Sequence, residues 1–169
     1  YGGIALVRRV SPMDVVRLPI PDGLHVVLAH PEQRMKTADA RAALPRAVSR
    51  EVAIHQMANV AAMVAACYTG DLPLLGRALD DQIAEPARGV LLPGFIEAKA
   101  AALAAGALGG SISGAGPTSF YLCDRAATAE AVARAVEGAY EQLGIGCSTR
   151  HCTPAPHGAL DAPEDARVA

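Results

Sequence analysis

The segment GGSISGAGPTSF, residues 109–120, holds four glycines and a proline within nine residues and then enters an apolar run. Glycine adopts positive φ at little cost and lets another backbone come close. Such a loop between two β-type segments is typical of either a tight hairpin or an anion cradle. A phosphate loop would need Lys and Ser or Thr after its last glycine, and a dinucleotide loop would need a glycine at 119 and a helix after it. Pro117 and Ser119 stand at these places. The spacing therefore favours a hairpin, with direct nucleotide binding or support of another domain's site as alternatives.

The pattern on both sides of this loop predicts an α+β domain. Upstream, GGIALVRRV (2–10) and LHVVLAHP (24–31) have the β-branched composition of strands, and SPMDVVRLPIPDG (11–23) is a strand or a loop between them. Downstream, a helix and a last strand follow the second strand of the hairpin. Further helices are expected at 36–44, capped by Thr37, at 49–68, at 72–94 with breaks at Pro86 and Pro93, at 95–106 and at 127–144, and the last strand at 145–152.

This order of elements is that of a split βαβ, or ferredoxin-like, fold. The crossover between its first two strands is enlarged by several helices, and an extra strand precedes the first. We predict one domain over residues 1–153 and a flexible tail over 154–169, where Pro, Ala, Gly and charged residues predominate. The chain opens on Tyr1 with an apolar strand pattern already under way, so we expect a fragment cut at a junction between domains.

Composition narrows the class of protein. The 169 residues carry a net charge of −2 with both signs mixed, which argues against a nucleic-acid partner. No apolar run approaches the roughly 20 residues that a membrane span needs, and no signal peptide is visible. The four cysteines form no C-x-x-C pair, which favours reduced thiols in a cytoplasmic protein without a membrane partner.

Arg41 and Arg88 are candidates for binding an anion. Thr37 and Arg41 are four residues apart, so both emerge from one face of a helix near its positive end. Arg88 lies where Pro86 is expected to break a helix, and its guanidinium could contact a carboxylate or a phosphate in a bidentate manner. Alternatively, each arginine is solvated or pairs with Glu85 or Asp81.

Other polar residues give weaker signals for metal or acid–base chemistry. The five histidines fall in no metal-ligand spacing, and His55 is more typical of a helix residue with a satisfied side chain. Asp80, Asp81 and Glu85 form an acidic helix face, which we interpret as solvated rather than as a magnesium site. No metal site is predicted.

Three segments together show a family resemblance: KTADARAALP (36–45), IAEPARGVLLPGF (83–95) and GGSISGAGPTSFYLCD (109–124). In this order and at these separations they resemble the C-terminal half of bacterial homoserine kinases, a branch of the GHMP kinase family. The resemblance runs from Tyr1 to about Cys152. SGAGPT resembles the third glycine-rich motif of the GHMP kinases, and the EPAR and TADAR segments point to the homoserine branch.

The resemblance implies transfer of the γ-phosphoryl group of ATP to the hydroxyl of L-homoserine, a step of threonine synthesis. It places Thr37 and Arg41 against the amino acid, Arg88 on its carboxylate, and the loop Ser113, Gly114, Ala115 and Gly116 beside the active site. The family's ATP loop and its magnesium-binding acid belong to an N-terminal domain that this sequence lacks. We therefore expect no catalytic residue in this chain and no activity of the chain alone. The expected partners are the N-terminal GHMP domain of the same protein and, in a homodimer, a second copy.

Two alternatives remain at this stage. The chain could be the C-terminal domain of another GHMP kinase for a small alcohol, although a substrate without an α-carboxylate would not need the two arginines. It could also be a separate ferredoxin-like module that binds an amino acid for regulation.

Overall fold

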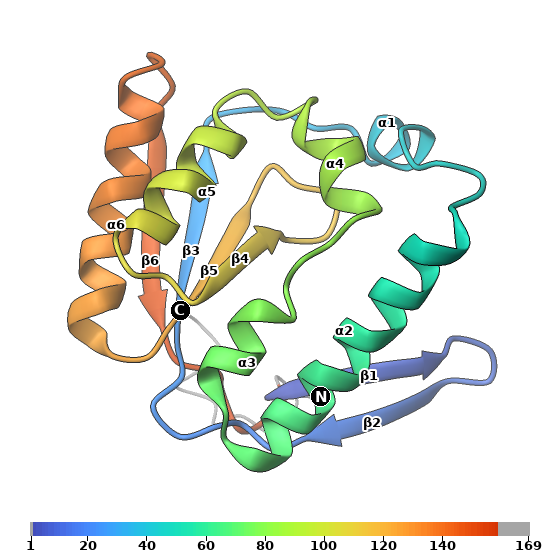
Figure 1. The fold of residues 1–169 in the computed structure, drawn as a ribbon. Helices are drawn as coiled ribbons and strands as arrows, with labels where there is room; N and C mark the ends of the chain where they lie inside the picture. Colours follow the sequence, from blue (N-terminus) through green and yellow to red (C-terminus); the bar gives the residue numbers. More distant parts are fainter. Residues whose placement is uncertain (1, 159–169) are drawn as a thin grey trace.

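The computed structural model describes residues 2–158 and confirms the predicted fold class. Its main sheet is antiparallel with the order β4-β5-β3-β6, which is the ferredoxin-like order. Figure 1 shows this sheet with β6 at one edge and β4 at the other. The strands are β3 (His25–Pro31), β4 (Gly109–Ile112), β5 (Ser119–Cys123) and β6 (Cys147–Cys152).

One face of the sheet forms a closed core with α5 (Phe95–Ala104) and α6 (Ala126–Glu141). Alternate strand residues point to this face because successive side chains in a strand lie on opposite sides of the sheet. Val27 and Ala29 of β3 and Tyr121 of β5 are fully buried there. They pack against helix residues of which Val132 and Val136 are also fully buried.

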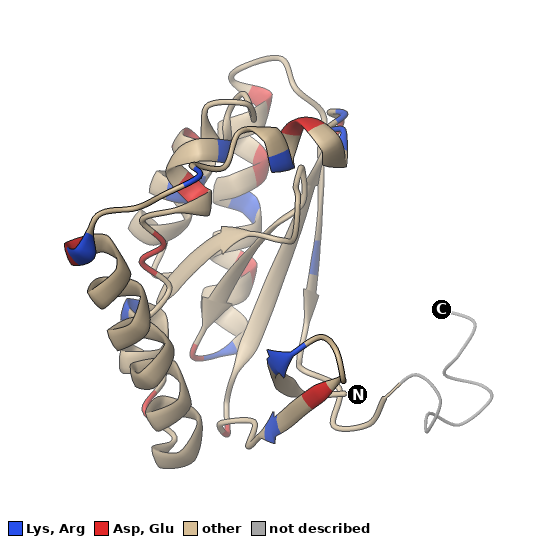
Figure 2. Ribbon diagram, turned by 90° about the vertical axis from the view of Figure 1, so that its right-hand side faces the viewer, with Lys and Arg blue, Asp and Glu red and all other residues tan. Residues whose placement is uncertain are grey.

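The opposite face supports a second core, which is built by four elements. These are β1 (Ile4–Arg9), β2 (Asp14–Leu18), α2 (Arg50–Thr69) and α3 (Leu72–Arg77). β1 and β2 pair as an antiparallel hairpin, so the segment 11–23, which the sequence left as strand or loop, contains a strand. This core is less complete, because a largely apolar cavity of about 340 Å³ lies among Ile4, Met63 and Phe120. Figure 2 shows α2 standing beside the sheet, with charged residues at its first turn only.

Two short helices, α1 (Thr37–Ala42) and α4 (Ala84–Gly89), lie together at the end of the sheet where the β4–β5 loop is found (Figure 1). Two predictions about them are wrong. The N-cap of α1 is Lys36, and Thr37 is its first residue and makes no capping bond. Pro86 does not break the helix, because it occupies the third position of α4, where backbone N–H groups have no partner within the helix.

The ends of α2 agree with the sequence. Ser49 is the N-cap, and its hydroxyl accepts a bond from the Val52 amide, while Gly70 ends the helix in the left-handed conformation.

The segment that follows β6 contacts the β1–β2 hairpin and the residue before it. Gly3 N donates to Ala155 O at 2.5 Å, and the Arg17 guanidinium donates to Pro156 O at 2.7 Å. Residues 159–169 of the predicted tail lie outside the described residues, and the domain boundary near 153 stays a prediction.

Candidate functional site

Arg88 joins the three segments on which the sequence analysis depends. Its Nε donates to the carbonyl of Ala40 in α1 at 3.0 Å, and its Nη1 donates to the carbonyl of Gly114 at 2.8 Å. The side chain is half-buried, and it pairs with neither Glu85 nor Asp81. One guanidinium thus fixes α1, α4 and the glycine loop relative to one another, although they are far apart in the sequence.

Thr37 and Arg41 are both exposed on α1, near Arg88. Within residues 2–158 neither side chain makes a hydrogen bond or an ion pair. Both are therefore available to a ligand at this end of the sheet. Their roles in ligand binding remain predictions.

The glycine loop is a hairpin, as predicted. Ser113 N donates to Thr118 O at 2.8 Å and Gly116 N to Ser113 O at 3.0 Å, which closes the turn between β4 and β5. Gly114 has a φ of 60° and open space where a Cβ would be, so this side of the loop is accessible. A Cβ on Gly116 would lie 3.0 Å from Leu92 Cδ1, so that side packs against the connection after α4.

The α4 helix that carries Arg88 is anchored by carboxylates. The Asp81 side chain accepts bonds from the amides of Ile83, Ala84 and Glu85 at 2.8–3.0 Å, and so caps the helix. Glu85 forms an ion pair with Lys99 of α5 and accepts a bond from Ser111 Oγ of β4 at 2.8 Å. Sequence reasoning missed these anchors; an aspartate just before the first turn of a helix is a common N-terminal signal, and Asp81 could have revealed the first of them.

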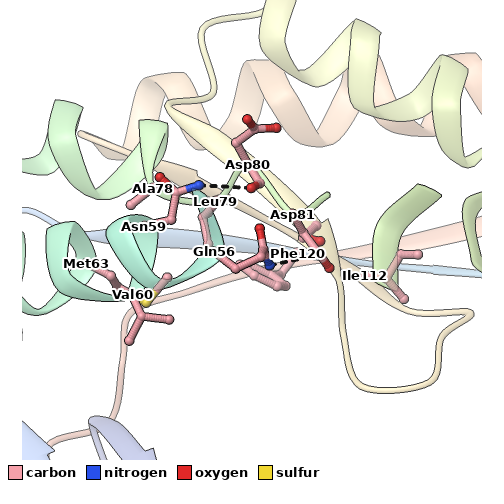
Figure 3. Close-up of a pocket in the computed structure, with 11 residues that line it drawn as sticks. Gln56, Asn59, Val60, Met63, Ala78, Leu79, Asp80, Asp81, Ile112 and Phe120 are labelled. Carbon is pink, nitrogen blue, oxygen red and sulfur yellow. Dashed lines mark hydrogen bonds between the residues drawn. The ribbon is translucent and has the colours of Figure 1, made fainter. Parts of the chain in front are cut away.

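Beside this site, a pocket of about 260 Å³ lies between α2, the α3–α4 connection and the sheet. Figure 3 shows the side chains that line it. Its polar side chains bind one another. Gln56 Nε2 donates to Asp81 Oδ1 at 3.2 Å, and Asn59 Nδ2 donates to Asp80 O at 3.0 Å. His55 Nε2 lies 2.9 Å from Asp80 Oδ2. The acids are thus engaged in local structure, and among residues 2–158 no group of three or more His, Cys, Asp or Glu could hold a metal ion.

The cysteines of the described chain are free thiols, and three of them lie in low-dielectric surroundings. Burial raises the pKa of the Cys67 thiol, and it raises the pKa of Cys123 and of Cys147 to about 11 in each case. Burial likewise raises the pKa of the Tyr121 hydroxyl to about 12. These groups stay protonated near neutral pH, so they are packing residues rather than nucleophiles.

Comparison with known proteins adds the family. Residues 63–142 match the family model described as GHMP kinases C terminal, which spans α3 to α6 together with the Arg88 helix and the glycine loop. This chain contains a GHMP kinase C-terminal domain. The match includes the predicted third glycine-rich motif at 113–118.

The relatives that are about 40% identical to this chain are homoserine kinases. The chain is 43% identical over 142 residues to the homoserine kinase of Chlorobium phaeobacteroides, which covers 84% of the chain and 44% of that protein. It is 38% identical over 159 residues to the homoserine kinase of Moorella thermoacetica, covering 94% of the chain and 53% of that protein. The chain therefore spans about half the length of the curated relatives it matches.

Solved structures agree with this. The homoserine kinase of Cytophaga hutchinsonii superposes with a TM-score of 0.91 at 42% identity, covering 94% of this chain and 50% of that one. A mevalonate kinase of L. major superposes with a TM-score of 0.70 at 17% identity, covering 93% of this chain and 51% of that one, which shows the shared fold alone.

The apolar composition of α2 has a place in this fold. By length and composition α2 is the one helix within residues 2–158 that could cross a membrane. Helices of soluble proteins can meet the same criteria. The criteria thus give no membrane assignment.

Proposed function

We propose that the chain is the substrate-binding half of an ATP-dependent homoserine kinase, which converts ATP and L-homoserine to O-phospho-L-homoserine and ADP in threonine synthesis, in the cytoplasm. The observation that carries the proposal is the 42–43% identity to homoserine kinases over 84–94% of the chain. It is supported by the contact that Arg88 makes with both α1 and the glycine loop.

The proposed site holds a zwitterionic amino acid by its carboxylate. Arginine has five N–H donors in a planar fork, and Arg88 uses Nε and Nη1 for the two carbonyls. Its Nη2 edge and the neighbouring Arg41 would bind the two carboxylate oxygens of homoserine. Thr37, exposed at the start of α1, would contact the rest of the amino acid. An alcohol without a carboxylate would leave both guanidinium groups without a partner.

ATP and Mg²⁺ would be bound mainly by an N-terminal GHMP domain. The chain has neither phosphate-loop fingerprint, and the acids beside the site are engaged as helix caps and ion pairs. Phosphoryl transfer depends on positioning and on charge stabilisation by metal and phosphate-loop donors, so the chain alone would be inactive. The open side of Gly114 would let the phosphate loop of the other domain approach.

The N-terminal domain would also cover apolar surface. On the β1–β2 hairpin Val10 is 74% exposed and Met13 57%, and on α2 Met57 is 64% exposed. Soluble monomers rarely leave large contiguous apolar patches uncovered. The N-terminal GHMP domain is the proposed occupant because the matched relatives are about twice as long as this chain.

A chimeric kinase tests the proposal. The C-terminal half of the Cytophaga hutchinsonii homoserine kinase is replaced by this chain, and ADP release is measured with Mg²⁺-ATP and homoserine. We expect homoserine-dependent turnover by the chimera, and none by the chain alone. Mevalonate and galactose serve as control acceptors. Preference for either acceptor over homoserine, or turnover by the isolated chain, would contradict the proposal.

A further inference from the structure

We propose that Glu85 is a positioning residue for Arg88: by binding Lys99 and Ser111 at once, it sets the rotation of α4 that aims the guanidinium at the substrate carboxylate. This inference rests on the proposed function, because it deepens the account of the homoserine clamp. Glu85 itself would contact no substrate.

Both oxygens of the Glu85 carboxylate are engaged. Oε1 lies 2.5 Å from Lys99 Nζ, and Oε2 accepts the hydroxyl hydrogen of Ser111 at 2.8 Å. The side chains of Glu85 and Lys99 are only 17% and 21% exposed. An ion pair removed from water to this extent is held in one geometry more firmly than a pair on the surface, where solvent screens the charges.

The α4 helix needs such an anchor because it is short. Its six residues are too few to be stable on their own, so side-chain contacts must fix its direction. Asp81 holds only the first amides of the helix. Glu85 ties the body of the helix to α5 through Lys99 and to β4 through Ser111, and these two contacts oppose rotation about the helix axis.

Arg88 follows Glu85 by three residues, close to one helical turn, so the two side chains are neighbours on α4. A small rotation at Glu85 would therefore displace the Nε and Nη1 contacts to Ala40 and Gly114. Those contacts in turn set where the Nη2 edge points. The network thus extends from Lys99 and Ser111 through Glu85 and the helix backbone to the clamp.

The test compares variants in the chimeric kinase. Glu85→Gln keeps the shape of the side chain and removes its charge, and we expect at least a tenfold rise in the homoserine KM with the ATP KM changed less than twofold. In an Arg88→Ala background the same change should alter the homoserine KM less than twofold, because no guanidinium remains to be aimed. The double variant Glu85→Lys with Lys99→Glu, which exchanges the two charges, should show a smaller rise in the homoserine KM than Glu85→Gln. Glu130→Gln on the exposed side of α6 is the matched control.

A second measurement on the chain alone is independent of turnover. In ¹H–¹⁵N spectra, the chemical shift of the Arg88 Nε–H group should move toward the values of solvent-exposed arginines in Glu85→Gln. It should not change in Glu130→Gln. The inference would be overturned if Glu85→Gln raised the homoserine KM as much in the Arg88→Ala background as in the unsubstituted chimera. It would also be overturned if the Arg88 signal did not move in Glu85→Gln. A chimera without homoserine turnover would contradict the proposed function instead, and the Arg88 signal would still decide whether Glu85 positions it.

Discussion

The two longest helices differ in how much of their surface the chain covers. The α6 helix has 16 residues, and five of them are buried in a single stripe that faces the sheet. The α2 helix has 20 residues, and only Ala66 and Cys67 are buried. Apolar side chains nevertheless occupy most of α2, and Ile54 and Val60 are at least half exposed. One helix is thus matched to the core that the chain provides, and the other has more apolar surface than the chain covers.

This difference reflects the two faces of the sheet. The face under α5 and α6 is closed within the described chain, whereas the face under α2 and the hairpin retains a largely apolar cavity. Amphipathic helices ordinarily turn their polar side to solvent. The proposed N-terminal domain would cover the exposed apolar side chains of α2. Placing a charge in each helix therefore tests the difference in burial between α6 and α2.

The largest effect is expected from a buried charge in the closed core. Val132→Asp would place a carboxylate where the side chain has no exposed surface, and we expect a loss of more than about 4 kcal/mol or no folding at all. Val60→Asp on α2, where the side chain is 50% exposed, should cost less than about 1 kcal/mol. Urea unfolding of the isolated chain measures both. Similar losses at the two positions would remove the distinction between the helices.

A smaller effect is expected where helix and strand backbones meet. A Cβ on Gly76 of α3 would lie 2.2 Å from Leu108 O, so Gly76→Ala should force the helix away from β4 and cost about 1–3 kcal/mol. Gly138 in α6 has open space around its Cβ position. Gly138→Ala should therefore stabilise the chain by about 0.5–1 kcal/mol. Thermal unfolding of both variants checks the opposite signs.

Alkaline pH should weaken the closed core gradually. Folding raises the pKa of Cys123 to about 11 from a reference of 9.0, chiefly through burial and also through the charge of Asp124. Below about pH 9 the thiol is protonated in both states, and its contribution to stability is complete. Between about pH 9 and 11 only the unfolded state loses the proton, so stability falls as pH rises. Urea unfolding across this range should show a shallower fall in Cys123→Ala; an unchanged slope would contradict the assignment.

The smallest effect on stability, and the clearest on association, is expected on α2. Met57→Lys should change the free energy of unfolding by less than about 0.5 kcal/mol, because the side chain is 64% exposed. The apolar surface of α2 that the chain leaves exposed should make the isolated chain self-associate. Met57→Lys should weaken this self-association, measured by sedimentation velocity, and should also weaken binding of the proposed N-terminal domain. Leu103→Lys, on the exposed side of α5, is the control and should change neither.

The order of the elements could be predicted because local signals were strong. Ser49 and Gly70 marked the ends of α2, and the glycine run marked the β4–β5 hairpin. Pro86 misled the prediction because proline is tolerated in the first turn, and the start of that turn depends on the Asp81 carboxylate. Burial along α2 could not be predicted from its composition, because an apolar helix can be covered by its own chain or by another domain.

For the candidate site, sequence supplied the residues and structure supplied their connections. The TADAR and EPAR segments named Thr37, Arg41 and Arg88, but no pattern indicated that Arg88 would bind the carbonyls of Ala40 and Gly114. Backbone carbonyls carry no sequence signature, so such contacts are visible only in three dimensions. The same holds for the meeting of Glu85 with Ser111, which are 26 residues apart.

Arg88→Lys in the chimeric kinase tests whether the Arg88 guanidinium holds the substrate carboxylate. Lysine keeps the charge but cannot bind two carboxylate oxygens while it also holds two carbonyls. We expect the homoserine KM to rise by the equivalent of about 2–3 kcal/mol of lost charged hydrogen bonding, with the ATP KM nearly unchanged. A homoserine KM equal to that of the unsubstituted chimera would contradict the account.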